Sequence, residues 1–356
     1  MTTELTTYDR MLRMYEHREA DRVPITDYPW GATIERWQRE GMPEGIDYAG
    51  WLGMDRMASI GTDVSPRYEH RVLEETDEYV VQTTSWGTTT KTWKHAASTP
   101  EFLAHHVVDA DTWREAKARM TPSRDRVDWA QLDANYRRWR EEGYWVQASF
   151  WFGFDVAHSW MIGTERVLMA MRTDPEWLVE IFNHYLDLCI AQFQMVWDEG
   201  YRFDAIGWPD DMGYKYHQFF SAGTYRELLK PVHRRAVEWA HAKGLKAHMH
   251  SCGDIRPLIP ELVDIGLDGL NPLEVKAGMD PVAIKREFGD KLLLQGGINA
   301  LLYNDMEALE AQVREVVPKM KENGGYIFSS DHSVPSSISL KDFQHLLALA
   351  RELGSY

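Results

Sequence analysis

The stretch FDAIGWPDDMGYKYHQFFSAGTYRELLKPVHRRAVEWAHAKGLKAHMHSCGD (203–254) contains a complete strand–helix–strand unit. Its apolar segment 203–208 predicts a strand, and 221–244 predicts a helix that begins after Ser221 and ends at Gly244, since serine caps helix starts and glycine ends helices. Segment 245–250 predicts the next strand. Strands that alternate with helices of this length indicate βαβ units and a parallel sheet.

The same alternation continues to residue 330. We expect helices at 255–266, 280–289 and 305–324, and strands at 267–272, 292–297 and 325–330. With strands at 23–28, 56–61 and 145–150 the total is about eight, the number of a (β/α)8 barrel. An open doubly wound sheet is the alternative, but no G-x-G-x-x-G follows a first strand.

We expect a single barrel domain over residues 1–356, with an N-terminal helical extension. The stretch 68–94 is rich in Thr, Val and Tyr and predicts an antiparallel insertion. Neither a linker nor an internal repeat divides the chain.

Composition excludes several classes of partner. The net charge of −16 argues against nucleic acid and anionic membrane surfaces. We find neither an apolar signal region at the N-terminus nor a run of about eighteen apolar residues, so neither secretion nor a membrane span is expected. Cys189 and Cys252 lie far apart in the sequence, which fits reduced thiols in the cytoplasm. Homodimer formation is left open.

Polar residues follow the predicted strands, where barrel enzymes carry their active sites. His250 and Cys252, two positions apart on an extended chain, share one face and suit zinc. Glu274 and His332 follow later strands and could complete a catalytic zinc site. The alternative is a packed strand end in which Cys252 behaves as a small apolar residue. His248 lies deeper and is expected to support the site.

Two further groups complete the predicted site. Asp210 and Asp211 could orient a ligand histidine, bind substrate or act as general acid and base, or one of them could brace the loop. Near the strand ends, ordinary packing competes with a pocket for an aromatic substrate. The candidate pocket residues are Trp30, Trp86, Trp151, Trp160, Trp208 and Asn299.

The stretch DDMGYKYHQFF through LNPLEVKAGMD (210–280), with LLLQGGINA (292–300) and GGYIFSSDHSVPSS (324–337), resembles the uroporphyrinogen decarboxylase-like superfamily. Within it the chain is similar to the methyltransferase branch, which includes methylcobalamin:coenzyme M methyltransferases. The resemblance extends from Arg22 onward and is strongest over about 203–335. It implies a barrel and a zinc ion held by an H-x-C pair, a glutamate and a downstream cysteine. His250, Cys252 and Glu274 match the first three.

The chain departs from both branches of the superfamily. The downstream Gly-Cys of the methyltransferases is Asp331-His332 here, and the decarboxylases also carry a histidine at this point. The arginine-rich segment with which decarboxylases hold porphyrinogen carboxylates is absent, because TDYPWGATIERW (26–37) follows RVPI. We therefore reject uroporphyrinogen decarboxylation. A histidine in place of a thiolate makes zinc a stronger Lewis acid, which favours a methyl ether or methanol-like donor.

These observations predict a zinc-dependent methyltransferase. The methyl group would pass between a small substrate or thiol, an aromatic methoxylated compound among the options, and a corrinoid on a separate protein, because the chain contains no corrinoid module. In this interpretation Asp210, Asp211 and His332 are catalytic. The alternatives are a decarboxylase or lyase that acts on a small acid through His332 and Asp211 without essential metal, and a non-catalytic barrel that binds a tetrapyrrole or corrinoid.

Overall fold

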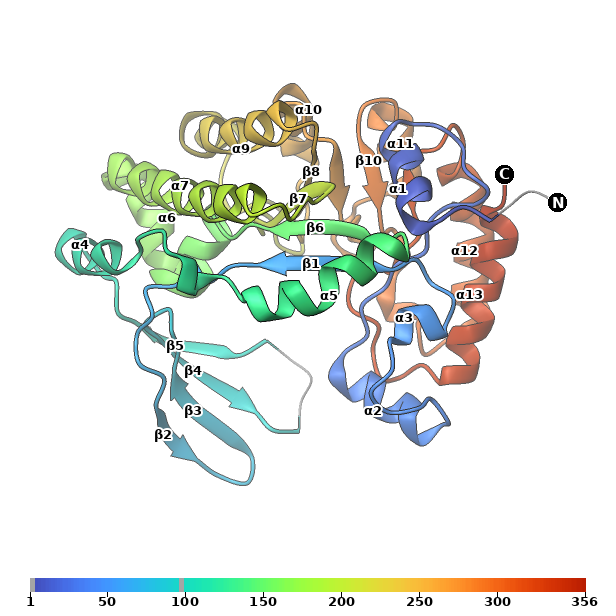
Figure 1. Cartoon of the computed structure of the whole chain (residues 1–356), viewed down its shortest axis with the longest axis horizontal. Helices are drawn as coiled ribbons and strands as arrows, with labels where there is room; N and C mark the ends of the chain where they lie inside the picture. The colour runs from blue at the N-terminus through green and yellow to red at the C-terminus, as the bar shows by residue number, and fades with distance from the viewer. Residues whose placement is uncertain (1–3, 96–98) are drawn as a thin grey trace.

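The fold is built on a curled parallel sheet of seven strands (Figure 1), seen in a computed structural model that describes residues 4–95 and 99–356. Each strand pairs in parallel with the next one along the sheet. Their order is β1 (Met57–Gly61), β6 (Trp145–Ser149), β7 (Ala205–Pro209), β8 (Lys246–His250), β9 (Gly269–Asn271), β10 (Leu293–Gln295) and β11 (Tyr326–Ile327). These strands confirm the predicted α/β class and lie within or close to the segments expected from the sequence.

The first expected strand, 23–28, does not form a regular ladder. It makes isolated parallel bridges at Ile25–Phe328 and Pro29–Val334, and the Ile25 carbonyl accepts from the Asp55 amide at 2.8 Å. Pro24 and Pro29 have no N–H to donate, and proline is confined to strand ends and edges for this reason. The expected closed barrel of eight strands is therefore observed as a sheet of seven strands. Segment 23–28 lies between its two edges, since Ile25 contacts Phe328 beside β11 and Asp55 beside β1.

Helices cover the outer face of the sheet (Figure 1). Ser221 caps its helix as expected, since its hydroxyl accepts from the Thr224 amide at 3.1 Å, but a π-helical turn interrupts the helix expected over 221–244. None of the helices in the described ranges is long and apolar enough to cross a membrane. The helices of the sheet and its connections are α4 (Ala110–Arg119), α5 (Trp129–Glu141), η2 (Val156–Met161), α6 (Thr164–Thr173), α7 (Pro175–Asp198), α8 (Ala222–Thr224), η3 (Tyr225–Leu229), α9 (Lys230–Ala242), α10 (Ile259–Asp264), α11 (Pro281–Phe288), α12 (Met306–Met320) and α13 (Leu340–Gly354).

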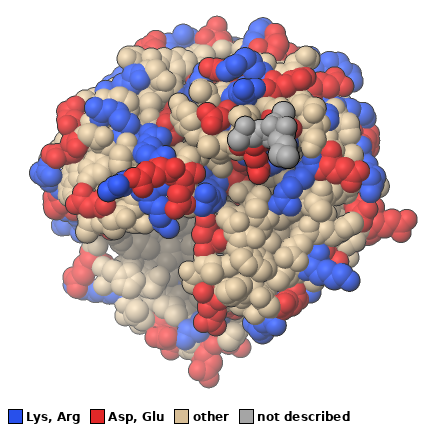
Figure 2. All heavy atoms as spheres, turned by 45° about the vertical axis from the view of Figure 1, so that its right-hand side comes forward, with Lys and Arg blue, Asp and Glu red and all other residues tan. Residues whose placement is uncertain are grey.

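The insertion forms a separate antiparallel sheet that projects from the carboxyl end of β1 (Figure 1). Its strands are β2 (Val72–Glu75), β3 (Tyr79–Thr83), β4 (Thr88–Trp93) and β5 (Glu101–His105). The antiparallel prediction for 68–94 is confirmed, but the sheet extends further because β5 pairs with β4. Figure 2 shows acidic and basic side chains intermixed over one face of the molecule, beside a hollow whose visible surface is mostly uncharged.

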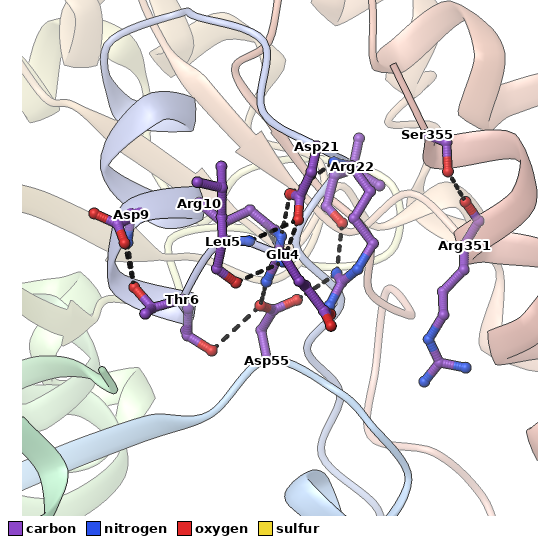
Figure 3. A network of polar contacts seen from close by, with 12 residues as sticks. Glu4, Leu5, Thr6, Asp9, Arg10, Asp21, Arg22, Asp55, Arg351 and Ser355 are labelled. Carbon is purple, nitrogen blue, oxygen red and sulfur yellow. Dashed lines mark hydrogen bonds and ion pairs between the residues drawn. The ribbon is translucent and has the colours of Figure 1, made fainter. Parts of the chain in front are cut away.

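The N-terminal region contributes α1 (Thr7–Tyr15), α2 (Gly31–Arg39) and α3 (Tyr48–Trp51). A buried ion cluster joins α1 to the start of β1 (Figure 3). The Arg10 guanidinium, 2% exposed, donates to both oxygens of Asp21 at 2.7 and 2.8 Å and to Asp55 at 2.5 Å. Arg22 donates to the other Asp55 oxygen at 2.7 Å. Asp55 therefore connects three chain segments.

Asp27 makes the stability of the fold depend on pH. Burial raises the pKa of this carboxyl to about 6, although Ser330 donates to it. Because the folded-state pKa lies above the unfolded value of about 4, stability falls as pH rises between these values and then stays lower. We expect the free energy of unfolding of the wild type to fall by on the order of 2 kcal/mol between about pH 4 and pH 7, and that of Asp27→Asn to lack this fall; urea unfolding at each pH measures both. Equal pH slopes for both proteins would contradict this expectation.

Candidate functional site

A cavity of about 240 Å³ opens inside the curl of the sheet, at the carboxyl ends of the strands. Parallel sheets bind ligands at this end, because the strand-to-helix loops converge there. Its walls combine aromatic and aliphatic side chains with amides, a serine and two histidines. The lining residues are Tyr28, Met57, Gln147, Ser149, Phe150, Trp151, Gly207, Trp208, Pro209, His248, His250, Asn271 and Gln295.

At the rim of this cavity lies one group of side chains able to hold a metal ion, the only such group found in the part of the chain that the structure describes. It consists of Asp211, His250 and Cys252, whose donor atoms lie within 4.8 Å of one another. The His250 Nε2 is 3.3 Å from the Cys252 Sγ and 3.5 Å from the Asp211 Oδ1. Ligands of a tetrahedral zinc, each bound at 2.0–2.3 Å, lie about 3.3–3.8 Å apart, so this spacing suits zinc.

The electrostatics of the group favour a cation. Burial, with Asp211 and Glu274 nearby, raises the pKa of the Cys252 thiol well above its ordinary value. Burial also raises the pKa of Asp211, against the opposing effect of His250. The charged forms of both groups would therefore gain from a positive partner, which a divalent ion could supply.

An amide connects His250 to the N-terminal helix. The Asn271 Nδ2 lies 3.0 Å from the His250 Nδ1, and the Asn271 Oδ1 lies 2.9 Å from the His248 Nε2. His248 Nδ1 lies 2.8 Å from the Tyr15 hydroxyl. If the Asn271 side-chain amide is turned by 180°, so that its oxygen faces His250, it accepts from the His250 Nδ1–H. The lone pair of the His250 Nε2 is then free for a metal. Partners of this kind orient histidine ligands.

Glu274 braces the loop that carries Cys252. Its Oε2 accepts from the Gly253 amide at 2.5 Å, and its Oε1 pairs with Lys276 at 3.1 Å. Gly253 has φ +82°, and a Cβ there would lie 2.2 Å from the Gly213 carbonyl carbon, so only glycine fits this crossing of two loops. Glu274 is outside the group of three donors, and its predicted role as a metal ligand stays a prediction.

Asp210 is placed differently from Asp211. It is fully buried, accepts from the Asp155 amide at 2.7 Å and lies 2.8 Å from the His233 Nε2. The Tyr225 hydroxyl lies 3.1 Å from the other ring nitrogen of His233, so this series of polar contacts extends to the π-helical turn η3. Neither aspartate is among the residues that line the cavity, but Asp211 belongs to the group of three donors at its rim and Asp210 does not. Of the paired aspartates, Asp210 therefore braces the loop and Asp211 faces the site.

His332 does not join the donor group. It is exposed, and its ring packs against Trp30 with 5.9 Å between centroids. Its neighbour Asp331 turns inward and accepts from the backbone amides of Val275 and Ala300. The third member of the group beside His250 and Cys252 is Asp211. Glu274 and His332, the other two ligands predicted from the sequence, lie outside the group, and the role of His332 as a metal ligand stays a prediction.

Some of the predicted pocket residues line the cavity and others do not. Trp151 and Trp208 line the cavity, whereas Trp30 and Asn299 do not. Asn299 caps the turn that follows it, since its Oδ1 accepts from the Leu301 amide at 3.0 Å.

Sequence reasoning missed three amides that face the cavity: Gln147, Asn271 and Gln295. Each is the single amide of a short strand whose other residues are apolar or small: WVQAS (145–149), GLN (269–271) and LLQ (293–295). An amide on the inner face of a barrel strand is costly to bury without partners, so this pattern was the available signal.

Residues 154–353, more than half of the chain, match the sequence profile described as uroporphyrinogen decarboxylase (URO-D). The chain belongs to the URO-D family. No curated protein sequence matches the chain.

Two solved structures were compared with the chain by superposition. A methyltransferase from Methanosarcina mazei superimposes with a TM-score of 0.64 at 16% identity, covering 98% of this chain and 99% of that one. The apo form of 3-keto-D-glucoside 4-epimerase from E. coli gives a TM-score of 0.36 at 12% identity, covering 63% of this chain and 85% of that one. At this identity the methyltransferase likeness shows the shared fold.

Proposed function

We propose that this member of the URO-D family is a zinc-dependent methyltransferase that moves a methyl group from a small, uncharged donor to a corrinoid carried by a separate protein. The observation that carries the proposal is the convergence of Asp211, His250 and Cys252 at the rim of the strand-end cavity. The structural likeness to a methyltransferase over nearly the whole chain is consistent with it.

The donor set fits zinc. Imidazole nitrogen, thiolate and carboxylate are the ligands that zinc takes in proteins, and three protein ligands leave one position open for substrate. With one thiolate and one carboxylate, this set carries the same charge as the four-residue set expected from the sequence, and it has one imidazole fewer. When bound, zinc supplies Lewis acidity toward the oxygen of a methyl ether or methanol-like donor.

The remaining residues position these donors. Asp211 Oδ1 accepts from the Cys252 amide at 2.8 Å, which holds the carboxylate and the thiol on one side of the loop. Asn271 fixes the ring of His250, and Glu274 fixes the turn at Gly253. In such a transfer the electron pair of the broken methyl–oxygen bond would stay on oxygen, and a cob(I)alamin nucleophile on the separate protein would supply the pair that bonds the methyl group.

The cavity favours an uncharged substrate. None of the described residues that line it is a lysine or arginine, and Gln147, Asn271 and Gln295 supply neutral hydrogen-bond partners. A carboxylate substrate would be desolvated here without a cation from the protein. This argues against the alternative of a decarboxylase acting on a small acid.

Metal analysis tests the proposal. We expect the purified protein to bind zinc stoichiometrically and Cys252→Ala to lose it, measured by elemental analysis after dialysis against trace zinc. Cys189→Ala is the matched control, because Cys189 is the other cysteine and is buried on α7. A wild-type protein without zinc, or equal zinc in Cys252→Ala, would overturn the metal site.

A further inference from the structure

A second cavity, of about 220 Å³, adjoins the first and shares Trp151 with it. Thr62, Asp63, Val64 and Ser65 follow β1 and form one side. Ser85 and Trp86 come from the turn between β3 and β4 of the insertion, and Trp160 comes from η2. The antiparallel insertion therefore contributes a wall beside the metal-site cavity.

Three partly exposed indoles form the apolar walls. The centroids of Trp86, Trp151 and Trp160 lie 5.8–6.4 Å apart, and Trp151 and Trp160 are nearly perpendicular at 82°. Trp86 also packs against the buried ring of Tyr185 at 5.9 Å. Indole faces and edges at these inclinations offer both stacking and edge-to-face contacts to a planar ring.

The turn that carries Trp86 is anchored to the main body. The Thr88 hydroxyl donates to the Trp160 carbonyl, and the Gly87 amide donates to the Thr84 carbonyl at 3.0 Å. The first contact joins two of the indole-bearing segments and the second closes the turn before any ligand arrives, so little ordering accompanies binding.

The cavity presents no free charge. Asp63 is the charged residue in its lining, and both of its oxygens are already used. Its Oδ1 accepts from the Ser65 amide at 2.9 Å, and its Oδ2 accepts from the Arg67 guanidinium at 2.6 Å. The Thr62 hydroxyl oxygen, by contrast, is buried and has no hydrogen-bond partner among the described residues.

We propose that this indole cavity, defined by Trp86, Trp151 and Trp160, binds an uncharged aromatic ring with a polar substituent, and that this ring is the aryl part of the methyl donor. The assignment of the ring to the donor rests on the proposed function. Stacking on the indoles holds the ring, and the Thr62 hydroxyl satisfies the substituent. A quaternary ammonium ion is the competing occupant, because aromatic faces also attract cations. The Asp63 carboxylate, which could add to that attraction, is already paired with Arg67.

Binding of simple probes to the full-length, metal-stripped protein tests the inference. We expect anisole (methoxybenzene) to bind, and benzoate and tetramethylammonium to bind at least about tenfold more weakly, in ligand-observed NMR titrations. Trp86→Ala should weaken anisole binding about tenfold, whereas Trp86→Phe should retain most of it. Trp93→Ala is the matched control, because Trp93 lies in the same insertion sheet but outside the cavity.

The outcomes separate this inference from the proposed function. Equal anisole affinity in Trp86→Ala and wild type, or tighter binding of tetramethylammonium, overturns the indole cavity as an aryl site. Should Trp86→Ala fail to fold, Thr62→Val decides with 4-methoxyphenol as probe, since its phenol hydroxyl is a polar substituent separate from the methoxy group. A loss of about threefold or more is expected, and equal affinity in Thr62→Val and wild type would overturn the inference. Zinc stoichiometry is measured separately, so a protein without zinc that still binds anisole through Trp86 contradicts only the metal site.

Discussion

Replacing Asp55 by alanine is expected to lower the free energy of unfolding by about 3–5 kcal/mol, because it leaves buried guanidinium groups without their counter-charge. The side chain of Asp55 is fully buried, and its two oxygens accept from Arg10 and Arg22 at 2.5 and 2.7 Å. It also accepts from the Ile25 amide at 2.7 Å, so the substitution removes a backbone partner as well. Urea unfolding measures the change.

An exposed ion pair supplies the control for Asp55. Asp111 pairs with Arg114 at 2.8 Å, but both side chains are more than 70% exposed. Such pairs contribute about 0–1 kcal/mol, and we expect Asp111→Ala to fall in that range. Equal destabilisation by the two substitutions would contradict a structural role for the buried cluster.

Replacing His250 by alanine is expected to weaken zinc binding by at least about 100-fold and to abolish methyl transfer, because the substitution removes a donor atom itself. His250 Nε2 is the central donor atom of the group, since it lies 3.3 Å from the Cys252 Sγ and 3.5 Å from the Asp211 Oδ1. Competition with a chromophoric chelator measures the affinity, and methylation of cob(I)alamin measures the transfer.

Graded variants distinguish donors from supporting residues. Asp211→Asn should approach the effect of His250→Ala, whereas Asn271→Leu, which removes only a partner of the His250 ring, should cost about 10–100-fold in affinity. His332→Ala should leave zinc affinity unchanged, since His332 is exposed against Trp30. A large loss in His332→Ala together with an unaffected Asp211→Asn would restore the donor set expected from the sequence.

The strand–helix alternation made most of the sheet predictable. The segments around β6, β7 and β8 have apolar residues at the spacing of buried parallel strands, and Ser221 caps its helix as its side-chain chemistry suggests. The segment 23–28 was overestimated as a strand because pattern reasoning counted its apolar residues and gave too little weight to Pro24 and Pro29. The fourth strand of the insertion, β5, was missed because its pairing with β4 is a long-range contact.

The candidate site was predictable only where its residues are close in sequence. His250 and Cys252 lie two positions apart at the end of one strand, so local geometry alone places them on one face. Asp211 follows the neighbouring strand, and the register that pairs Pro209 with His250 brings it to them. Asp210 differs from it by a single position, yet it points into the core toward His233.

By itself, the sequence determined the βαβ architecture, the antiparallel character of the insertion and the pairing of His250 with Cys252, because periodicity and short spacings act locally. Only the tertiary structure decided that Asp211 joins His250 and Cys252 in one group of donor atoms, and that Trp86 reaches the indole cavity beside Trp151. Those choices depend on strand register and on loops that meet from distant parts of the chain. No local pattern encodes the direction in which such a loop turns its side chains.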